Sequence, residues 1–429
     1  MRLELGTFPV REVAFGRTTR WQAGRLEINR AEVLEAVRAD LRIASADLEL
    51  ARPGESARLW PVRDVIEPRI KVEGPGTVYP GICGRPITTV GQGRTHRLAG
   101  VGVTEVSSVN WHEAGGDYVD LFLDLSGPWA ELIPLSALQH VCLVVEPDPA
   151  LESVARNEAV HHAALVVADR LAMATRELEP PEREVFELRP VDPALPGVVY
   201  IQCLHSPQAM SHSEHTFCTA TYGLTRLTPP WVMHPNEILD GAITGPYRTA
   251  FATSWTVANN PVLLELYRRH GVDFRLLGVI AFRTEWTTQH EKELMALQAA
   301  KTARMLGAQG ALVTWDAGGN EFIEVIHTVR ACERLGIQTV FLTSEDTPAG
   351  GAPTMLEPVP EADAIVSTSF FNAAVLGLGE LPPMDRVIGL PTRVVGETRD
   401  RVVPVAGPLA PPWRYDDHYG FGRLSAFAY

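Results

Sequence analysis

The C-terminal half of the chain alternates short apolar segments with longer amphipathic ones, and this order restricts the possible folds more than any other feature. Residues 277–282, 311–315 and 339–343 have the composition of buried strands. Between them, 288–306 and 321–335 have apolar residues at helical spacing, and each is followed by a glycine that can end a helix. A strand–helix–strand–helix–strand order implies a parallel sheet with right-handed crossovers. We therefore predict an α/β fold with a Rossmann-like parallel sheet in this half.

The N-terminal part has a different pattern. Short alternating apolar segments are separated by glycine and proline turns, which favours a β-rich structure. Residues 151–178 then have helical spacing, and Pro180 and Pro181 among like charges interrupt the pattern. The sequence thus predicts a β-rich α+β N-terminal domain closed by a helix (1–178), a linker (179–195) and an α/β C-terminal domain (196–429).

Charge and cysteine content exclude several classes of protein. The 429 residues include 38 Lys and Arg against 52 Asp and Glu, and the resulting net charge of −14 disfavours nucleic-acid binding. Five cysteines, few and odd in number, argue against a disulfide framework and for a reducing compartment. The N-terminus lacks the pattern of a signal peptide, and no apolar run approaches the ~18 residues of a membrane span. We expect a cytoplasmic protein without membrane or nucleic-acid partners.

The densest group of reactive side chains contains His205, His212, His215, Cys218 and His234. On a helical turn, the spacing of three between His212, His215 and Cys218 would place these side chains on one face. Imidazole and thiolate are ligands that zinc and other late transition metals prefer. The spacing matches no established zinc signature, so a polar loop with surface histidines is the alternative to a metal site.

A short loop follows the predicted strand 311–315 and precedes the next helix. Its residues Gly318, Gly319 and Asn320 offer backbone N–H groups at a helix N-terminus, which suit an anion such as a carboxylate. Asp316 and Glu321 flank the loop and could supply a general base or a substrate contact. Both acidic residues also suit ordinary helix capping, which needs no function.

The charge-rich stretch 51–74 contains a long and specific series of motifs. It reads Ala-Arg-Pro-Gly-Glu-Ser at 51–56, Pro-Val-Arg-Asp-Val-Ile-Glu-Pro-Arg at 61–69 and Lys-Val-Glu-Gly at 71–74. Further motifs lie along the chain at 1–6, 93–96, 126–128, 240–243, 259–261, 266–267, 269–271, 381–384 and 388–389. On these segments the sequence strongly resembles the component B proprotein of glycine, sarcosine and betaine reductases and is identified as a member of that family.

The resemblance implies a substrate-specific subunit of a reductase that cleaves a C–N bond. In such proteins the precursor cuts itself before a cysteine shortly after the Asp-Gly-Ala-Ile segment, and the cysteine becomes a pyruvoyl group. The pyruvoyl carbonyl forms a Schiff base with the substrate amine. A selenoprotein thiol then displaces the amine and delivers a carboxymethyl group to component C. The implied partners are a small amine or amino-acid-like substrate and a thiol or selenoprotein.

This sequence departs from the family pattern where that group would form. Residues 244–255 contain no cysteine, and Ser254 is their only residue that could give pyruvoyl. We therefore do not expect a pyruvoyl group. His234 stands before Pro235, where the family would have a small polar residue. A lost carbonyl and several added imidazoles together suggest a metal-centred Lewis acid, zinc or another divalent transition metal.

The sequence therefore predicts a family-related enzyme that cleaves a C–N or similar bond without pyruvoyl, as a metal-assisted lyase or hydrolase. Arg94 and the glycine loop would hold the substrate carboxylate, and Glu237, Asp240 or Asp316 would carry the proton. We also expect a homo-oligomer. Two alternatives remain, a component B subunit working with a thiol or selenol partner protein and a non-catalytic structural or regulatory subunit.

Overall fold

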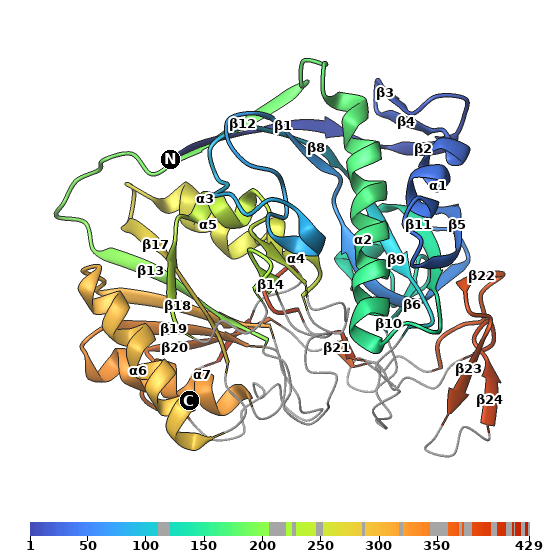
Figure 1. Ribbon diagram of the computed structural model, residues 1–429. Helices are drawn as coiled ribbons and strands as arrows, with labels where there is room; N and C mark the ends of the chain where they lie inside the picture. The colour runs from blue at the N-terminus through green and yellow to red at the C-terminus, as the bar shows by residue number, and fades with distance from the viewer. Residues whose placement is uncertain are drawn as a thin grey trace.

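The structure is a computed structural model. It describes residues 1–109, 121–205, 220–224, 229–245, 252–284, 288–316, 321–343, 359–368, 371–372, 380–395, 401–408, 414–415, 417–421 and 425–427. The elements form a mixed α/β architecture with several sheets and fewer helices, so the predicted α/β class is confirmed (Figure 1). The division into domains at 1–178, 179–195 and 196–429 and the Rossmann-like arrangement stay predictions.

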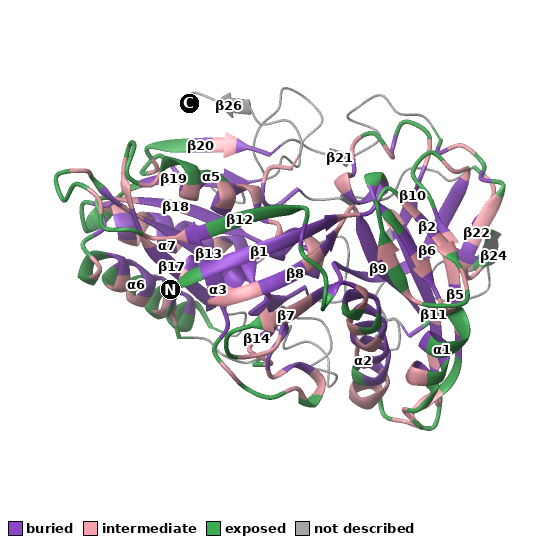
Figure 2. Cartoon of the chain, turned by 90° about the horizontal axis from the view of Figure 1, so that it is seen from above, coloured by how far each residue is buried: buried purple, intermediate pink, exposed green. Residues whose placement is uncertain are grey.

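The first sheet has four strands in the order β12-β1-β8-β7. Its members are β1 (Arg2–Pro9), β7 (Arg69–Glu73), β8 (Gly93–Ala99) and β12 (Glu182–Glu187). β1 pairs in parallel with β8 and antiparallel with β12. The segment 179–195, which the sequence suggests is a linker, therefore contains an edge strand of this sheet. Figure 2 shows β12 largely exposed beside the buried β1.

The second sheet has the order β10-β6-β9-β11-β5, and β22 also pairs with β6. Its members are β5 (Ile43–Ala51), β6 (Ala57–Ile66), β9 (Val101–Val106), β10 (Leu121–Asp124), β11 (Gln139–Pro147) and β22 (Arg386–Gly389). Helices α1 (Arg30–Arg38) and α2 (Ser153–Ala172) pack on this sheet, and α2 runs across it in Figure 1. The α1 helix begins where Asn29 accepts the N–H of Glu32, which satisfies one of its free donors.

The third sheet carries the C-terminal half and has the order β15-β17-β13-β18-β19-β20-β26. Its members are β13 (Gly197–Leu204), β15 (Trp231–Met233), β17 (Arg275–Arg283), β18 (Gly310–Trp315), β19 (Gln338–Thr343), β20 (Ala364–Ser367) and β26 (Ser425–Phe427). The five strands from β17 to β20 along this order pair in parallel, and β15 and β26 pair antiparallel to their neighbours. Helices α6 (Gln289–Met305) and α7 (Phe322–Arg334) connect consecutive parallel strands.

The predicted elements of this half are confirmed within one or two residues. The predicted strands 277–282, 311–315 and 339–343 are β17, β18 and β19, and the predicted helices are α6 and α7. One difference is that β13 lies between β17 and β18 and hydrogen-bonds to both. The crossover through α6 therefore passes over β13. The alanines of α6 allow this close packing, since Ala299, Ala300 and Ala303 are buried in the core that the strands form.

Shorter elements complete the described part of the chain. They are α3 (Pro235–Leu239), α4 (Ser254–Ala258), α5 (Pro261–Arg269), β2 (Glu12–Phe15), β3 (Arg20–Gln22), β4 (Arg25–Ile28), β14 (Ala220–Thr221), β16 (Ile243–Thr244), β21 (Phe371–Asn372), β23 (Thr392–Val395), β24 (Arg401–Pro404) and β25 (Arg414–Tyr415). Among the described helices, none is both long and apolar enough to cross a membrane. The cysteines Cys83, Cys142, Cys203 and Cys332 have free thiols.

Arg58 connects the second sheet to residues more than 300 positions later in the chain. Its Nε and Nη2 donate to the two carboxylate oxygens of Asp124, at 2.6 and 2.7 Å. The same guanidinium donates to the carbonyls of Pro382, Val405 and Gly407. Both charged side chains are fully buried. The ion pair therefore lies in the core, at the place where β6 contacts the C-terminal residues Pro382, Val405 and Gly407.

Candidate functional site

The carboxyl ends of the parallel strands in the third sheet bring together three residues that the sequence singles out. His205 follows β13, and Asp316 follows β18, which is the next strand in the sheet. The backbone N–H of His205 donates to Asp316 Oδ1 at 2.5 Å. Both residues are buried. Ligands of such sheets usually bind beyond this edge.

The third residue at this edge is Glu321, at the start of α7. Its Oε1 lies 3.1 Å from His205 Nδ1, and both side chains are at most 2% exposed. A carboxylate beside one imidazole nitrogen orients the ring. Metal binding was predicted for His205, proton transfer for Asp316 and substrate binding for Glu321. The structure places all three in one cluster, and their roles stay predictions.

Six of the predicted site residues lie outside the described residues. They are His212, His215, Cys218, Gly318, Gly319 and Asn320. Within the described ranges, no group of three or more His, Cys, Asp or Glu side chains could hold a metal ion. The zinc site and the carboxylate-binding loop therefore stay predictions, and nothing in the described part supports a metal-assisted reaction.

His234 and Glu237 lie at the start of α3, where they cap the helix. His234 Nδ1 accepts the N–H of Asn236 at 3.2 Å, and Glu237 Oε2 accepts the N–H of His234 at 2.6 Å. Glu237 Oε1 also accepts the hydroxyl of Tyr222. Burial lowers the pKa of His234 to about 4, so its ring is neutral at neutral pH. Helix capping alone therefore accounts for the positions of both side chains.

Asp240 joins the end of α3 to the β7–β8 region. Its carboxylate accepts the hydroxyl of Thr95 at 2.5 Å and the N–H of Gly91 at 2.7 Å, and it forms an ion pair with Lys71. A fully buried carboxylate with three donors is well satisfied without any substrate. The geometry therefore favours a structural role for Asp240 over the predicted proton carrier.

Arg94, predicted to bind the substrate carboxylate, lies on β8 in the first sheet. Its Nε donates to Glu4 Oε1 on the neighbouring strand β1, at 2.6 Å. This pairing holds the guanidinium of Arg94 against the surface of the first sheet. The structure does not bring Arg94 together with His205 at the edge of the third sheet.

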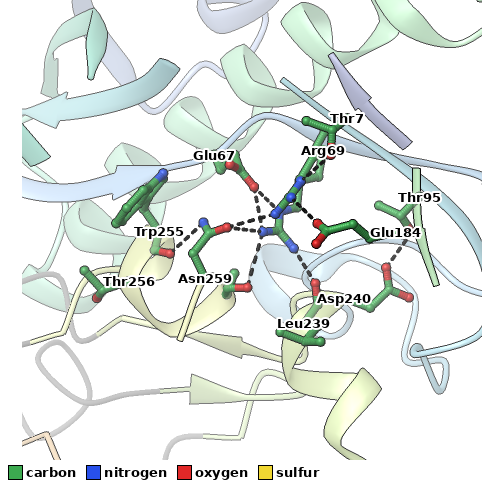
Figure 3. Close-up of polar contacts among 12 residues, drawn as sticks. Thr7, Glu67, Arg69, Thr95, Glu184, Leu239, Asp240, Trp255, Thr256 and Asn259 are labelled. Atoms are coloured by element: carbon green, nitrogen blue, oxygen red, sulfur yellow. Dashed lines mark hydrogen bonds and ion pairs between the residues drawn. The ribbon is translucent and has the colours of Figure 1, made fainter. Parts of the chain in front are cut away.

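A second buried network, shown in Figure 3, surrounds Arg69 of β7. Arg69 Nε donates to Glu67 Oε2 at 2.7 Å, and its Nη1 donates to the carbonyl of Leu239. Its Nη2 lies 3.3 Å from both the carbonyl of Ala258 and Oδ1 of Asn259. One arginine thus ties the first sheet to the ends of α3 and α4. Glu67, Arg69 and Asn259 belong to the segments that carry the family resemblance, and Leu239 and Ala258 directly precede two of them.

Sequence reasoning missed Asp64, which lies on β6 of the second sheet and binds Ser254 at the start of α4. Asp64 Oδ2 accepts the hydroxyl of Ser254 at 2.5 Å, and Oδ1 accepts the N–H of Ser254 at 2.9 Å. The N–H of Gly245 donates to Ser254 Oγ at 3.0 Å. Burial raises the pKa of Asp64 to about 6. The sequence signal that could have identified Asp64 was its position within the Pro-Val-Arg-Asp motif.

These contacts test whether Ser254 fits a pyruvoyl group. A carbonyl cofactor has to meet the substrate amine, but the Ser254 side chain is fully buried and bound by Asp64 and Gly245. The carbonyl of Thr253, at the bond a self-cleaving serine would break, accepts the N–H of Val257 as the first turn of α4. Ser254 therefore serves as an anchor of α4 and does not fit the cofactor.

We expect the purified protein to be one uncut chain. Its intact mass under denaturing conditions should correspond to 47.0 kDa, and a hydrazine reagent should add no mass. The Ser254→Ala variant should give the same single species. Two fragments that meet between Thr253 and Ser254 would contradict this assignment.

Asp64 should make the folded protein less stable as the pH rises. Its folded pKa of about 6 lies above the usual 3.8, so the folded protein binds this proton more tightly than the unfolded chain. The free energy of unfolding should therefore fall as the pH rises from 4 to 6, by about 2–3 kcal/mol from this group. Urea unfolding of the wild type and of Asp64→Asn across this range measures the difference. An identical pH dependence in both proteins would refute the assignment.

Comparison with known proteins agrees with the resemblance in the sequence. A family model described as glycine/sarcosine/betaine reductase component B subunits matches residues 1–400. The sarcosine reductase complex component B subunit alpha of Peptoclostridium acidaminophilum is 36% identical over 91% of this chain and 90% of its own length. The betaine reductase complex component B subunit alpha of the same organism is 36% identical over 91% of this chain and 88% of its own length.

A third relative extends the comparison to another substrate. The glycine reductase complex component B subunits alpha and beta of P. acidaminophilum are 33% identical over 91% of this chain and 89% of that protein. No solved structure matches this chain significantly. The family model and these relatives span nearly the whole chain, and the chain therefore belongs to the glycine/sarcosine/betaine reductase component B family.

Proposed function

We propose that this chain is the substrate-specific subunit of a reductase complex that cleaves the C–N bond of a small amine or amino-acid-like substrate. The observation that carries the proposal is its similarity, over about nine tenths of its length, to component B subunits of three reductase complexes. Those relatives favour the reductase alternative over a metal-assisted lyase or hydrolase. Their identities of 33–36% are nearly equal, so they favour none of the three substrates.

The pair of His205 and Glu321 supports a chemical role for the sheet edge. A primary or secondary amine bound in its neutral form has to take up a proton before it leaves carbon, since the free amide anion is far too basic to depart, whereas the quaternary nitrogen of betaine needs no proton. His205 would donate that proton to the nitrogen of glycine or sarcosine, and Glu321, 3.1 Å from Nδ1, would hold the imidazole ring in place. Asp316 holds the backbone of His205 at the strand end. The carbon would pass to the sulfur or selenium of a partner protein, so one C–N bond breaks as one bond to carbon forms.

A reconstituted reaction tests this function. The full chain is mixed with a thiol- or selenol-bearing carrier protein of a related reductase, the acceptor component and a dithiol reductant. Glycine, sarcosine and betaine are then supplied in turn. We expect release of ammonia, methylamine or trimethylamine from at least one of them, and only when the carrier is present. Amine release that does not need the carrier, or none from any of the three, would refute the proposal.

A further inference from the structure

Segment 417–421 lies at the carboxyl ends of β13 and β18, the two strands that lead to His205 and Asp316. Its shape is fixed by Asp417, whose Oδ1 accepts the backbone N–H groups of the residues two, three and four positions later, at 3.3, 2.8 and 3.0 Å. Several backbone donors on one carboxylate oxygen hold a chain in a tight turn. The first three residues of the segment are at most 4% exposed. The segment is therefore a packed loop of the protein interior.

Two side chains of segment 417–421 contact the two strands directly. Tyr419 accepts a hydrogen bond from Gln202 Nε2 of β13 at 2.8 Å, and both side chains are at most 1% exposed. The ring centroid of His418 lies 6.4 Å from that of Trp315, the last residue of β18, in an edge-to-face arrangement. One short segment thus contacts the ends of two neighbouring strands.

The pairing of β13 with β18 ends just before the candidate site. Its last pair is Cys203 with Trp315, so His205 and Asp316 lie beyond the ladder that joins the two strands. Residues beyond the end of a ladder move more freely unless other groups hold them. Gln202 is three positions before His205, and Trp315 directly precedes Asp316. Segment 417–421 therefore supports both strands where their own hydrogen bonds stop.

Tyr419 is suited to a contact that does not change with pH. Burial, followed by the nearby carboxylate of Asp316, raises the pKa of the Tyr419 phenol far above its usual value. The hydroxyl therefore stays neutral wherever the protein is folded, and its hydrogen bond with Gln202 is kept. A group that does not titrate is a poor proton carrier but a good support.

We propose that Tyr419 is a positioning residue, which through Gln202 holds segment 417–421 on the ends of β13 and β18 and so keeps His205 and Asp316 in place. The effect on turnover rests on the proposed function. The segment lies beyond residue 400, where the match to the family model ends, and the family resemblance gives it no role. A displacement of about 1 Å can lower the rate of a catalysed step by about 100-fold, so loss of this support should lower kcat.

Turnover by the full chain in the reconstituted reaction tests the proposal. Tyr419→Phe removes the hydroxyl and keeps the ring, and it should slow the release of ammonia from glycine or of methylamine from sarcosine by about 3- to 10-fold. Tyr419→Ala also removes the ring, and the loss should be about 10- to 100-fold. The substrate KM should stay within about twofold, because Tyr419 acts through the strands. The pH profile of Tyr419→Phe should keep the wild-type shape.

Tyr267→Phe is the matched control. Tyr267 of α5 donates its hydroxyl to Asn236, and its ring packs on Phe186 of the first sheet. This variant loses the same kind of hydrogen bond at a different place, so its melting temperature should fall about as much as that of Tyr419→Phe, with kcat within about twofold of the wild type. An equal loss of kcat in both phenylalanine variants would overturn the proposal, and so would wild-type kcat in Tyr419→Ala.

Nuclear magnetic resonance with isotope-labelled histidine tests the positioning without turnover. The Cε1–H signal of His205 is identified by its loss in His205→Ala. We expect both Tyr419 variants to shift this signal and Tyr267→Phe to leave it in place. An unshifted His205 signal in the Tyr419 variants would overturn the proposal. A shifted signal, in a protein whose wild type cleaves none of the three substrates, would leave the positioning role standing and refute the reductase function.

Discussion

Replacing Arg58 by methionine should lower the free energy of unfolding by about 3–5 kcal/mol, because the change leaves the buried carboxylate of Asp124 without its counter-charge. Methionine fills much of the same space, so packing loss contributes little. The variant also loses the donors that hold the carbonyls of Pro382, Val405 and Gly407. Urea unfolding followed by circular dichroism measures the effect.

An exposed ion pair provides the control for Arg58. Arg20 donates to Glu27 at 2.8 Å, but its side chain is 60% exposed. Water competes for such a pair, and Arg20→Met should change stability by less than about 1 kcal/mol. Equal losses in the two variants would show that burial is not the source of the effect at Arg58.

Replacing His205 by alanine should reduce the release of ammonia from glycine or of methylamine from sarcosine by about 100- to 10,000-fold, because the leaving amine loses its proton donor. The substrate KM should change little, since His205 acts on the leaving nitrogen and does not hold the rest of the substrate. Glu321→Gln keeps the shape of the side chain and removes its charge, and we expect a smaller loss of kcat with a changed pH profile.

His290 is the control for this series. It lies exposed in the first turn of α6, so His290→Ala should leave both kcat and KM unchanged. A His205→Ala enzyme that retains wild-type kcat would remove His205 from the mechanism. An increase in KM with an unchanged kcat would indicate that His205 binds the substrate and does not transfer the proton.

The local part of the fold could be predicted from the sequence, and the long-range part could not. The strands and helices from β17 to β19 have patterns that are visible within a few residues. The insertion of β13 between β17 and β18 has no local signal, because it depends on pairing with strands about 80 and 110 residues later. The prolines and charges of the segment 179–195 likewise indicate a linker, but part of this segment forms β12, which pairs with the distant strand β1.

The candidate site was predicted as separate residues and not as a unit. His205, Asp316 and Glu321 each stood out by residue type, but their grouping requires β13 and β18 to be neighbours. Asp64 was named only as part of a motif, and only its burial and hydrogen bonding reveal that it contacts Ser254. Conversely, Asp240 and Glu237 stood out as acids near a motif, whereas their partners are backbone N–H groups and neighbouring side chains.

The pairing of β22 with β6 has a consequence for how the chain is made. β6 ends at Ile66, but its neighbour β22 ends at Gly389, so the second sheet is incomplete until most of the polypeptide has left the ribosome. A nascent chain therefore exposes the backbone edge of β6 at 57–60, which β22 later covers, throughout the synthesis of the C-terminal half. An unpaired strand edge of this kind is a site where aggregation can begin.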